Sequence, residues 1–346
     1  MKKSVALIIL SLLLLFTGCV PNVEPPHQPD LSIKELDGCG LQVHFIDVGQ
    51  GDCVLLKSEN ASVLIDSGTS ESGTKINAYL NSLDIDELDY FICTHPHDDH
   101  IGGAATVIRN NKIKTVFMNG DVSTSYSIEK LLDALEKTDT NAQIPKLHMK
   151  YTAQDICFTF LSPDKDYENM NDNSLVVMAE YKNCRILITG DAEKEVERSL
   201  IESGCDLKAD LLKVSHHGSR NASTEMFLAK VSPAVCVIQS EQGNSYGHPH
   251  EEAIDRLKKS GANILRCDEL GSIVIYCDGE AFYDENKTPY RAGENLFVNS
   301  VYIGNNKSKK YHTQYCRSLP GEKNRIVFNS REDAEKAGYT PCGNCN

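Results

Sequence analysis

The 346-residue sequence has little positive charge: 35 lysines and arginines stand against 49 aspartates and glutamates, a formal net charge of −14. This balance excludes a generally basic surface for nucleic acid or anionic lipid. A polyanionic substrate would have to be attracted locally, by metal ions and by a few cations such as Lys213 and Arg220. The charge therefore argues against a high-affinity DNA-binding protein, but only weakly against a nuclease.

The apolar run near the N-terminus, Val5 to Phe16, is too short to cross a bilayer comfortably. It follows two lysines and is typical of a signal-peptide core. The junction Thr17-Gly18-Cys19 resembles the bacterial lipobox, whose cysteine is acylated and becomes the mature N-terminus. We therefore expect a lipoprotein signal peptide over residues 1–18, lipidation at Cys19 and a lipid anchor on the extracytoplasmic face of the cell membrane. The alternative is an ordinary secretory signal with a chance cysteine.

The sequence also lacks repeats and low-complexity stretches, apart from a proline-rich segment at 19–39 that we interpret as an extended tether. From residue 40 to 284, strand and helix patterns alternate, with helical patterns at 75–83, 127–136 and 251–259. Two halves of this kind predict an α/β domain of two packed sheets flanked by helices. A polar linker at 285–300 and a small Cys/His-containing module at 301–346 complete the predicted organisation.

The strongest chemical signal is His95-Pro96-His97-Asp98-Asp99-His100, directly after an apolar strand. Residues i and i+2 of an extended segment project the same way, so His95 and His97 can share one ion. Asp99 and His100, where the chain turns toward a helix, can reach a second ion. Imidazole and carboxylate together suit Zn²⁺ or Mn²⁺ better than Ca²⁺ or Mg²⁺. The alternative is a solvated loop, against which the density of ligand side chains argues.

Two later strands end in further ligand side chains. Asp191 stands at the end of one buried strand, in a position suited to bridging two ions, and His216 and His217 follow another. Because strand ends gather at one rim of a sheet sandwich, these groups can converge with the histidine block. His216 is nearer to the strand end, so we take it as the ligand and keep His217 as the alternative.

Seven motifs between residues 43 and 276 follow one another in the order and spacing of a known family. They are Phe45-Ile46-Asp47-Val48-Gly49-Gln50-Gly51-Asp52, Leu64-Ile65-Asp66-Ser67-Gly68, the His95–His100 block, Asn171-Asp172-Asn173-Ser174-Leu175, Thr189-Gly190-Asp191, His216-His217-Gly218-Ser219 and Asn244-Ser245-Tyr246-Gly247-His248-Pro249. This set resembles the metallo-β-lactamase superfamily, and more closely the hydrolase domain of the DNA-uptake protein ComEC and its relatives. The resemblance implies an αββα sandwich for the domain at 40–284.

The same resemblance implies a ligand set. One ion would lie on His95 and His97, and a second on Asp99, His100 and His216; Asp191 would bridge them, and Asp66 would orient the histidine block. Many superfamily members supply a further histidine to the first ion just before the hairpin that turns at 182–183. This sequence has no histidine there, which predicts a first site that is incomplete, weaker or Mn²⁺-preferring. We keep Asn171, Ser174 and His217 as residues that support ligands or contact substrate.

The tail carries a second metal pattern. His312, Cys316, Cys342 and Cys345 form H-x₃-C and C-x₂-C pairs, and one imidazole with three thiolates can close a tetrahedral structural Zn²⁺ site. A module at 301–346 has a small core, so a metal would stabilise it. It resembles the zinc-binding domain of the DNA-repair protein Ada, which has a cysteine where this sequence has His312, and which implies a helix over 330–339. The alternative is a disulfide among these cysteines.

These features predict an extracytoplasmic metal-dependent hydrolase in which hydroxide bridging two Zn²⁺ or Mn²⁺ ions attacks a phosphodiester. Asp99 is the catalytic ligand, and His248 or water protonates the leaving oxygen; a plain loop histidine is the alternative interpretation of His248. DNA is the first expected substrate, by the resemblance, and no protein partner is inferable. A phosphorylcholine esterase or lactonase acting on cell-wall or small-molecule esters is one alternative function. A non-catalytic surface-binding protein on the same fold is another.

Overall fold

The computed structural model describes residues 35–121, 123–293, 302–313, 316, 318–328 and 331–343. The expected signal peptide, Cys19 and most of the proline-rich tether lie outside these residues, as do Cys345 and much of the linker. Within the described ranges, no helix combines the length and apolar character needed to cross a membrane.

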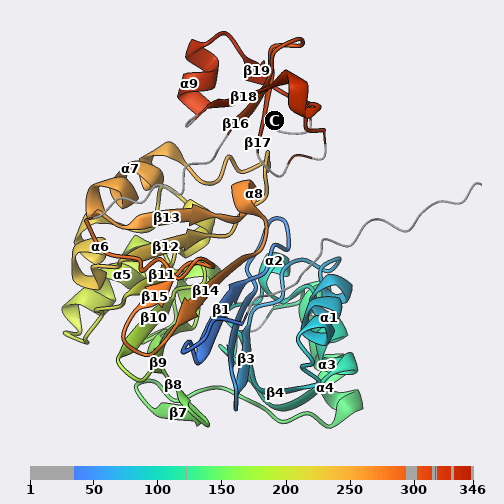
Figure 1. The fold of residues 1–346 in the computed structure, drawn as a ribbon. Helices are drawn as coiled ribbons and strands as arrows, with labels where there is room; N and C mark the ends of the chain where they lie inside the picture. The colour runs from blue at the N-terminus through green and yellow to red at the C-terminus, as the bar shows by residue number, and fades with distance from the viewer. Residues whose placement is uncertain are drawn as a thin grey trace, which may run out of the picture. The chain divides into compact units, whose positions relative to one another are not determined.

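Two mixed sheets dominate the described part of the chain between residues 35 and 293 (Figure 1). One has the strand order β15 (Phe282–Tyr283), β14 (Ile273–Cys277), β1 (Leu41–Phe45), β2 (Val54–Ser58), β3 (Ser62–Ile65), β4 (Glu87–Cys93), β5 (Lys112–Met118) and β6 (Ala142–Gln143). The other has the order β13 (Asn263–Arg266), β12 (Val235–Ile238), β11 (Leu211–Lys213), β10 (Cys184–Ile188), β9 (Val176–Tyr181), β8 (Ile156–Ser162) and β7 (Lys150–Ala153).

The sheets share an apolar core because strand side chains alternate between the two faces. Phe45 of β1 and Val63 of β3 lie in the same buried cluster as Ile186 and Ile188 of β10. The intervening Leu187 belongs to a second cluster instead, which β10 shares with the helices on its outer face. Each sheet is therefore apolar on both faces, as a layered fold requires.

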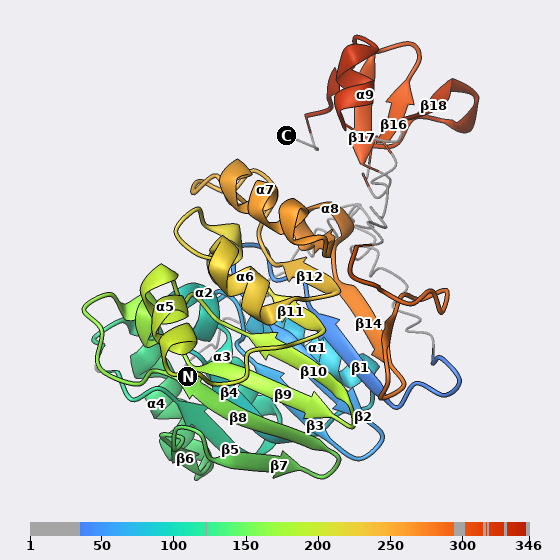
Figure 2. The ribbon, with the colours of Figure 1, turned by 90° about the vertical axis from the view of Figure 1, so that its left-hand side faces the viewer.

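Helices cover the outer face of each sheet (Figures 1 and 2). The outer helices are α1 (Gly73–Ser82), α3 (Ala104–Asn110) and α4 (Tyr126–Thr138) on the first sheet, and α5 (Lys194–Glu202), α6 (Glu225–Val231) and α7 (Glu251–Ser260) on the second. The predicted helical patterns correspond to α1, α4 and α7, and the hairpin turning at 182–183 is formed by β9 and β10. The expected αββα sandwich is confirmed.

Strand ends position the predicted ligands. β4 ends directly before the histidine block, which continues into α2 (Asp98–Ile101). β10 and β11 are parallel neighbours, with Ile186 paired to Leu211, so the segments after them emerge at the same edge of the second sheet. Asp191 lies in the first of these segments, and the two histidines lie in the second, the 3₁₀ turn Ser215–Gly218.

The tail forms a small sheet of its own. Its strands have the order β18 (Arg325–Phe328), β16 (Tyr302–Asn305), β17 (Lys310–Thr313) and β19 (Thr340–Pro341). α9 (Arg331–Lys336) occupies the middle of the expected helical segment. Among the described residues of the tail, the apolar cluster consists of Tyr302, Tyr311, Ala334 and Tyr339, with Phe328 packed against it, which agrees with the expectation of a small core.

Candidate metal centre

Asp66 holds the histidine block at both ends. Its Oδ1 accepts a hydrogen bond of 2.8 Å from the backbone N–H of Thr94, and its Oδ2 accepts one of 2.7 Å from the Thr94 hydroxyl. The same Oδ2 lies 2.8 Å from Nδ1 of His100, which must donate because a carboxylate only accepts. Asp66 is thus fully buried and hydrogen-bonded to both Thr94 and His100.

Asp99, His100, Asp191 and His217 come together at the rim, with one ligand atom from each all within 4.8 Å of one another. Nε2 of His217 lies 3.2 Å from Oδ2 of Asp99. Nε2 of His100 lies 3.1 Å from Oδ1 of Asp191. Two ligands at about 2.1 Å from a tetrahedral ion are about 3.4 Å apart, so this spacing fits one divalent ion.

The unpaired atoms of this group point to the same conclusion. Nε2 of His100, Nε2 of His217 and Oδ1 of Asp191 are buried and have no hydrogen-bond partner among the described residues. Burying polar atoms without partners is costly, and a bound cation would satisfy all three. The donor set of imidazoles and carboxylates therefore fits Zn²⁺ or Mn²⁺.

The structure brings His217, rather than the sequence-based choice His216, into this group. Nδ1 of His217 lies 3.1 Å from Oδ1 of Asp52. Burial would lower the pKa of His217, but the carboxylates of Asp191 and Asp52 raise it to about 9. The backbone carbonyl of Gln239, 3.0 Å from the same Nδ1, accepts its hydrogen bond, and Asp52 supports His217 as a neighbouring negative charge. Sequence patterns alone did not indicate this function for Asp52, although the residue ends the Gly49-Gln50-Gly51-Asp52 turn.

Lys213 is fully buried and forms an ion pair with Asp52. Its Nζ also donates a hydrogen bond of 2.9 Å to the backbone carbonyl of Val214. The expectation that Lys213 attracts a polyanionic substrate is therefore wrong, because its charge is neutralised inside the protein. Arg220 does lie at the surface, with Glu252 at 3.5 Å.

His95 and His97 lie together on the other side of Asp191. Nε2 of His95 is 3.0 Å from Nδ1 of His97 and 3.8 Å from Oδ2 of Asp191. Burial and the neighbouring His100 lower the pKa of His95 well below its usual value, so its ring is neutral and available as a ligand. Of the sequence-predicted pair, His95 therefore faces the second oxygen of Asp191, and His97 contacts His95.

Ser174 and Asn171 precede the hairpin at the place of the absent histidine. The Ser174 hydroxyl accepts a hydrogen bond of 3.1 Å from the backbone N–H of Asp191 and lies 3.3 Å from Nδ1 of His95. The Ser174 hydroxyl therefore contacts both Asp191 and His95. The Asn171 side-chain oxygen is buried and has no hydrogen-bond partner within the described ranges.

His216 and His248 lie at the outer edge of the centre. Nε2 of His216 is 3.6 Å from Oδ2 of Asp191, and its Nδ1 is 2.9 Å from Glu193. The His248 ring packs against that of His216, with centroids 5.3 Å apart. Burial and the adjacent His216 lower the pKa of His248 to about 4, so the ring is neutral at neutral pH.

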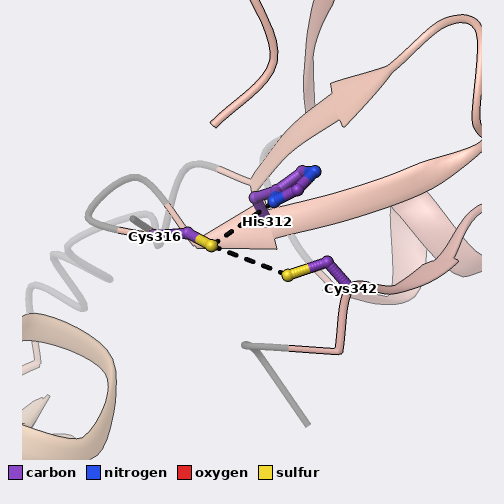
Figure 3. Close-up of side chains that lie close together, drawn as sticks. All are labelled: His312, Cys316 and Cys342. Carbon is purple, nitrogen blue, oxygen red and sulfur yellow. Dashed lines mark hydrogen bonds between the residues drawn. The ribbon is translucent and has the colours of Figure 1, made fainter. Parts of the chain in front are cut away.

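The tail brings three of its four predicted ligands together (Figure 3). Cys316 Sγ lies 3.4 Å from Nδ1 of His312 and 3.6 Å from Sγ of Cys342. Sulfurs at about 2.3 Å from a tetrahedral zinc ion would be about 3.8 Å apart, whereas a disulfide would bring them to about 2 Å. This group could hold a structural metal, and Cys345 lies outside the described residues.

Comparisons with known proteins agree with this architecture. Residues 46–122 match the model of the metallo-beta-lactamase superfamily. The chain is 31% identical over 251 residues to ComE operon protein 3 of Bacillus subtilis, covering 67% of this chain and 32% of the relative. It is also 31% identical over 231 residues to competence protein ComA of Neisseria gonorrhoeae, covering 66% and 31%. The chain thus spans about a third of the length of these relatives.

Among solved structures, the metallo-beta-lactamase fold protein YhfI of Bacillus subtilis matches with a TM-score of 0.49 and 15% identity. The match covers 68% of this chain and 98% of that one.

Proposed function

We propose that this chain, which matches the metallo-beta-lactamase superfamily over residues 46–122 and is about 30% identical to competence proteins, is a metal-dependent phosphodiesterase acting on DNA. The observation that carries the proposal is the buried His/Asp cluster around Asp191. The similarity to competence proteins supports DNA as the first substrate to test. We further propose that the protein acts on the extracytoplasmic face of the membrane, anchored through Cys19.

In this proposal, the residues of the centre divide between two metal ions. Asp191 presents one carboxylate oxygen toward His95 and the other toward His100, so it would contribute a ligand to both halves of the centre. Asp99, His100 and His217 would hold one ion, and His95 and His97 would hold the other. When bound, two such ions supply a water of lowered pKa and neutralise charge on a phosphoryl group.

His248 is placed to contact the substrate rather than a metal. Its Nδ1 is buried without a hydrogen-bond partner among the described residues, while its backbone is held by Asn244. A neutral ring donates a hydrogen bond but holds no extra proton to release. The leaving oxygen therefore takes its proton from water, or from His248 once a bound phosphate anion has raised the pKa of that ring.

The test is cleavage of plasmid, linear duplex and a small phosphodiester by protein reconstituted with Mn²⁺ or Zn²⁺. We expect wild type to nick plasmid, and Asp191→Ala to lose the most activity because it releases both ions. Asp99→Ala should abolish turnover through one ion. Asp98→Ala is the matched control, since its exposed side chain is bonded to Ser127 and not to the cluster.

Other outcomes of these assays would support the alternative functions. A fully metallated protein that leaves all three substrates intact but releases choline from teichoic acid, or opens a lactone, is an ester hydrolase on the same fold. A metallated protein inactive on every one of these substrates supports a surface-binding protein. In both cases the phosphodiesterase proposal is rejected.

A further inference from the structure

We infer that Tyr246, at the rim of the metal centre, is a stacking platform for a base of a nucleic-acid substrate, and that it is thereby a specificity-determining residue. The inference deepens the proposed function and rests on it: the metal ions would hold the phosphodiester, and Tyr246 would hold a neighbouring base. The occupant is an unpaired base, because a base within a duplex is already stacked between its neighbours.

The Tyr246 side chain is exposed to solvent beside the centre. The residue is 65% exposed, although tyrosine usually buries most of its ring. Tyr126, at the start of α4, is exposed to a similar 67%, but the Nζ of Lys130 lies 4.9 Å from the centroid of its ring. The Tyr246 ring instead stacks on His248, with centroids 5.7 Å apart and planes inclined by 20°.

Ring contacts connect Tyr246 to the candidate ligands. The His248 ring lies 5.3 Å from that of His216 and 6.1 Å from that of His217, measured between centroids. Nε2 of His217 lies in turn 3.6 Å from Oδ1 of Asp191. Tyr246 is therefore one ring beyond His248 from the metal centre, where a strand whose phosphate is bound at the centre can place a neighbouring base.

The loop that carries Tyr246 is fixed by its own hydrogen bonds. Oδ1 of Asn244 accepts hydrogen bonds of 3.1 Å from the backbone N–H groups of both Tyr246 and His248. The backbone N–H of His250 donates a 2.9 Å hydrogen bond to the carbonyl of Gly218, which ends the turn that carries the two histidines. A ring that is already held in place loses little conformational freedom when a ligand binds, so its contacts contribute more to affinity.

Stacking suits a protein whose charge repels nucleic acid. The chain carries a net charge of −14, and Lys213 is paired with Asp52. Base–aromatic stacking needs contact between two flat faces rather than opposite charges, and every base offers such a face. Tyr246 can thus retain a strand without a basic surface. A lactone or a choline ester of teichoic acid presents no flat aromatic face, so the exposed ring favours a nucleic acid among the substrates considered.

The first experiment compares two substrates that differ only in their bases. The full chain, reconstituted with Mn²⁺, is assayed on single-stranded oligothymidylate and on an abasic strand of equal length. Tyr246→Ser should raise KM for oligothymidylate by roughly 5- to 150-fold, leave kcat nearly unchanged and leave the abasic strand unaffected. Tyr246→Phe keeps the ring and should retain the wild-type KM. Tyr126→Ser, at the equally exposed tyrosine, is the matched control and should also behave as wild type.

A binding measurement separates this inference from the phosphodiesterase proposal. The probe is a short phosphorothioate strand, chosen because it resists hydrolysis, with one 2-aminopurine base, whose fluorescence falls when it stacks on an aromatic ring. Wild type and Tyr246→Phe should quench the fluorescence, and Tyr246→Ser should not, at equal metal content in all three. Quenching by wild type without cleavage of any substrate would support the platform and reject the proposed function. Equal quenching by Tyr246→Ser, or an unchanged KM for oligothymidylate in that variant, would overturn the inference.

Discussion

At the scale of single residues, the centre depends on carboxylates behind the ligands as much as on the ligands themselves. Asp52 is the clearest case, since it contacts His217 on one side and Lys213 on the other, all three buried. A buried carboxylate is tolerated only when it is paired and hydrogen-bonded. Lys213 therefore acts on the candidate ligand His217 indirectly, by keeping Asp52 charged and in place.

Replacing Lys213 tests this role. Lys213→Met keeps the length of the side chain but leaves Asp52 with less compensation, and breaking a buried ion pair costs about 3–5 kcal/mol. We expect the free energy of unfolding, measured in urea, to fall by roughly that amount. Lys208→Met, at an exposed position nearby, is the control and should change stability by less than about 0.5 kcal/mol. Equal stability of the two variants would contradict a structural role for the pair.

At the scale of elements, the function depends on segments that follow strands rather than on the strands themselves. The close approach of two such segments explains one glycine. Gly51 has φ of +137°, and a Cβ there would collide with the backbone carbonyl of Asp99. The Gly49–Asp52 turn can thus lie directly against the histidine block, where the N–H of Asp52 donates to the same carbonyl at 3.1 Å.

The tail is the second element whose chemistry is testable. Its described core is small, so a zinc ion on His312, Cys316 and Cys342, with Cys345 as the expected fourth ligand, should stabilise it. Cys316→Ser should lower the zinc content of the full chain by one equivalent and leave Mn²⁺ binding at the Asp191 centre unchanged. Cys157→Ser is the control, since that free thiol lies on β8. Unchanged zinc content in Cys316→Ser would reject the structural site.

At the scale of the whole molecule, the charge of −14 sets the long-range field that a nucleic acid meets. Repulsion of a polyanion is screened as the Debye length falls from about 30 Å at 0.01 M salt to about 8 Å at 0.15 M. If DNA is the substrate, its attraction is local to the metal ions, because Lys213 is already paired with Asp52.

This field predicts an unusual salt dependence. As salt is raised over that range, kcat/KM on plasmid should stay constant or rise. Enzymes that bind DNA through lysine and arginine instead lose affinity for DNA steeply as salt is added. A small singly charged phosphodiester is the control and should respond less. A steep fall in kcat/KM on plasmid with added salt would mean that a basic phosphate-binding surface exists and would contradict the prediction.

The sequence by itself determined the layered fold and most of the candidate ligand set, but not the choice between His216 and His217. Strand periodicity and ligand spacing within His95–His100 are local properties, readable without long-range contacts. Only the tertiary structure decided how those members divide between the two sides of Asp191. His216 and His217 are adjacent in sequence, and consecutive left-handed residues turn them toward opposite oxygens. The carboxylates that support them, Glu193 and Asp52, come from different strand ends. Lys213 has a charge typical of a surface, yet it ends β11, an interior strand of its sheet, and is buried there.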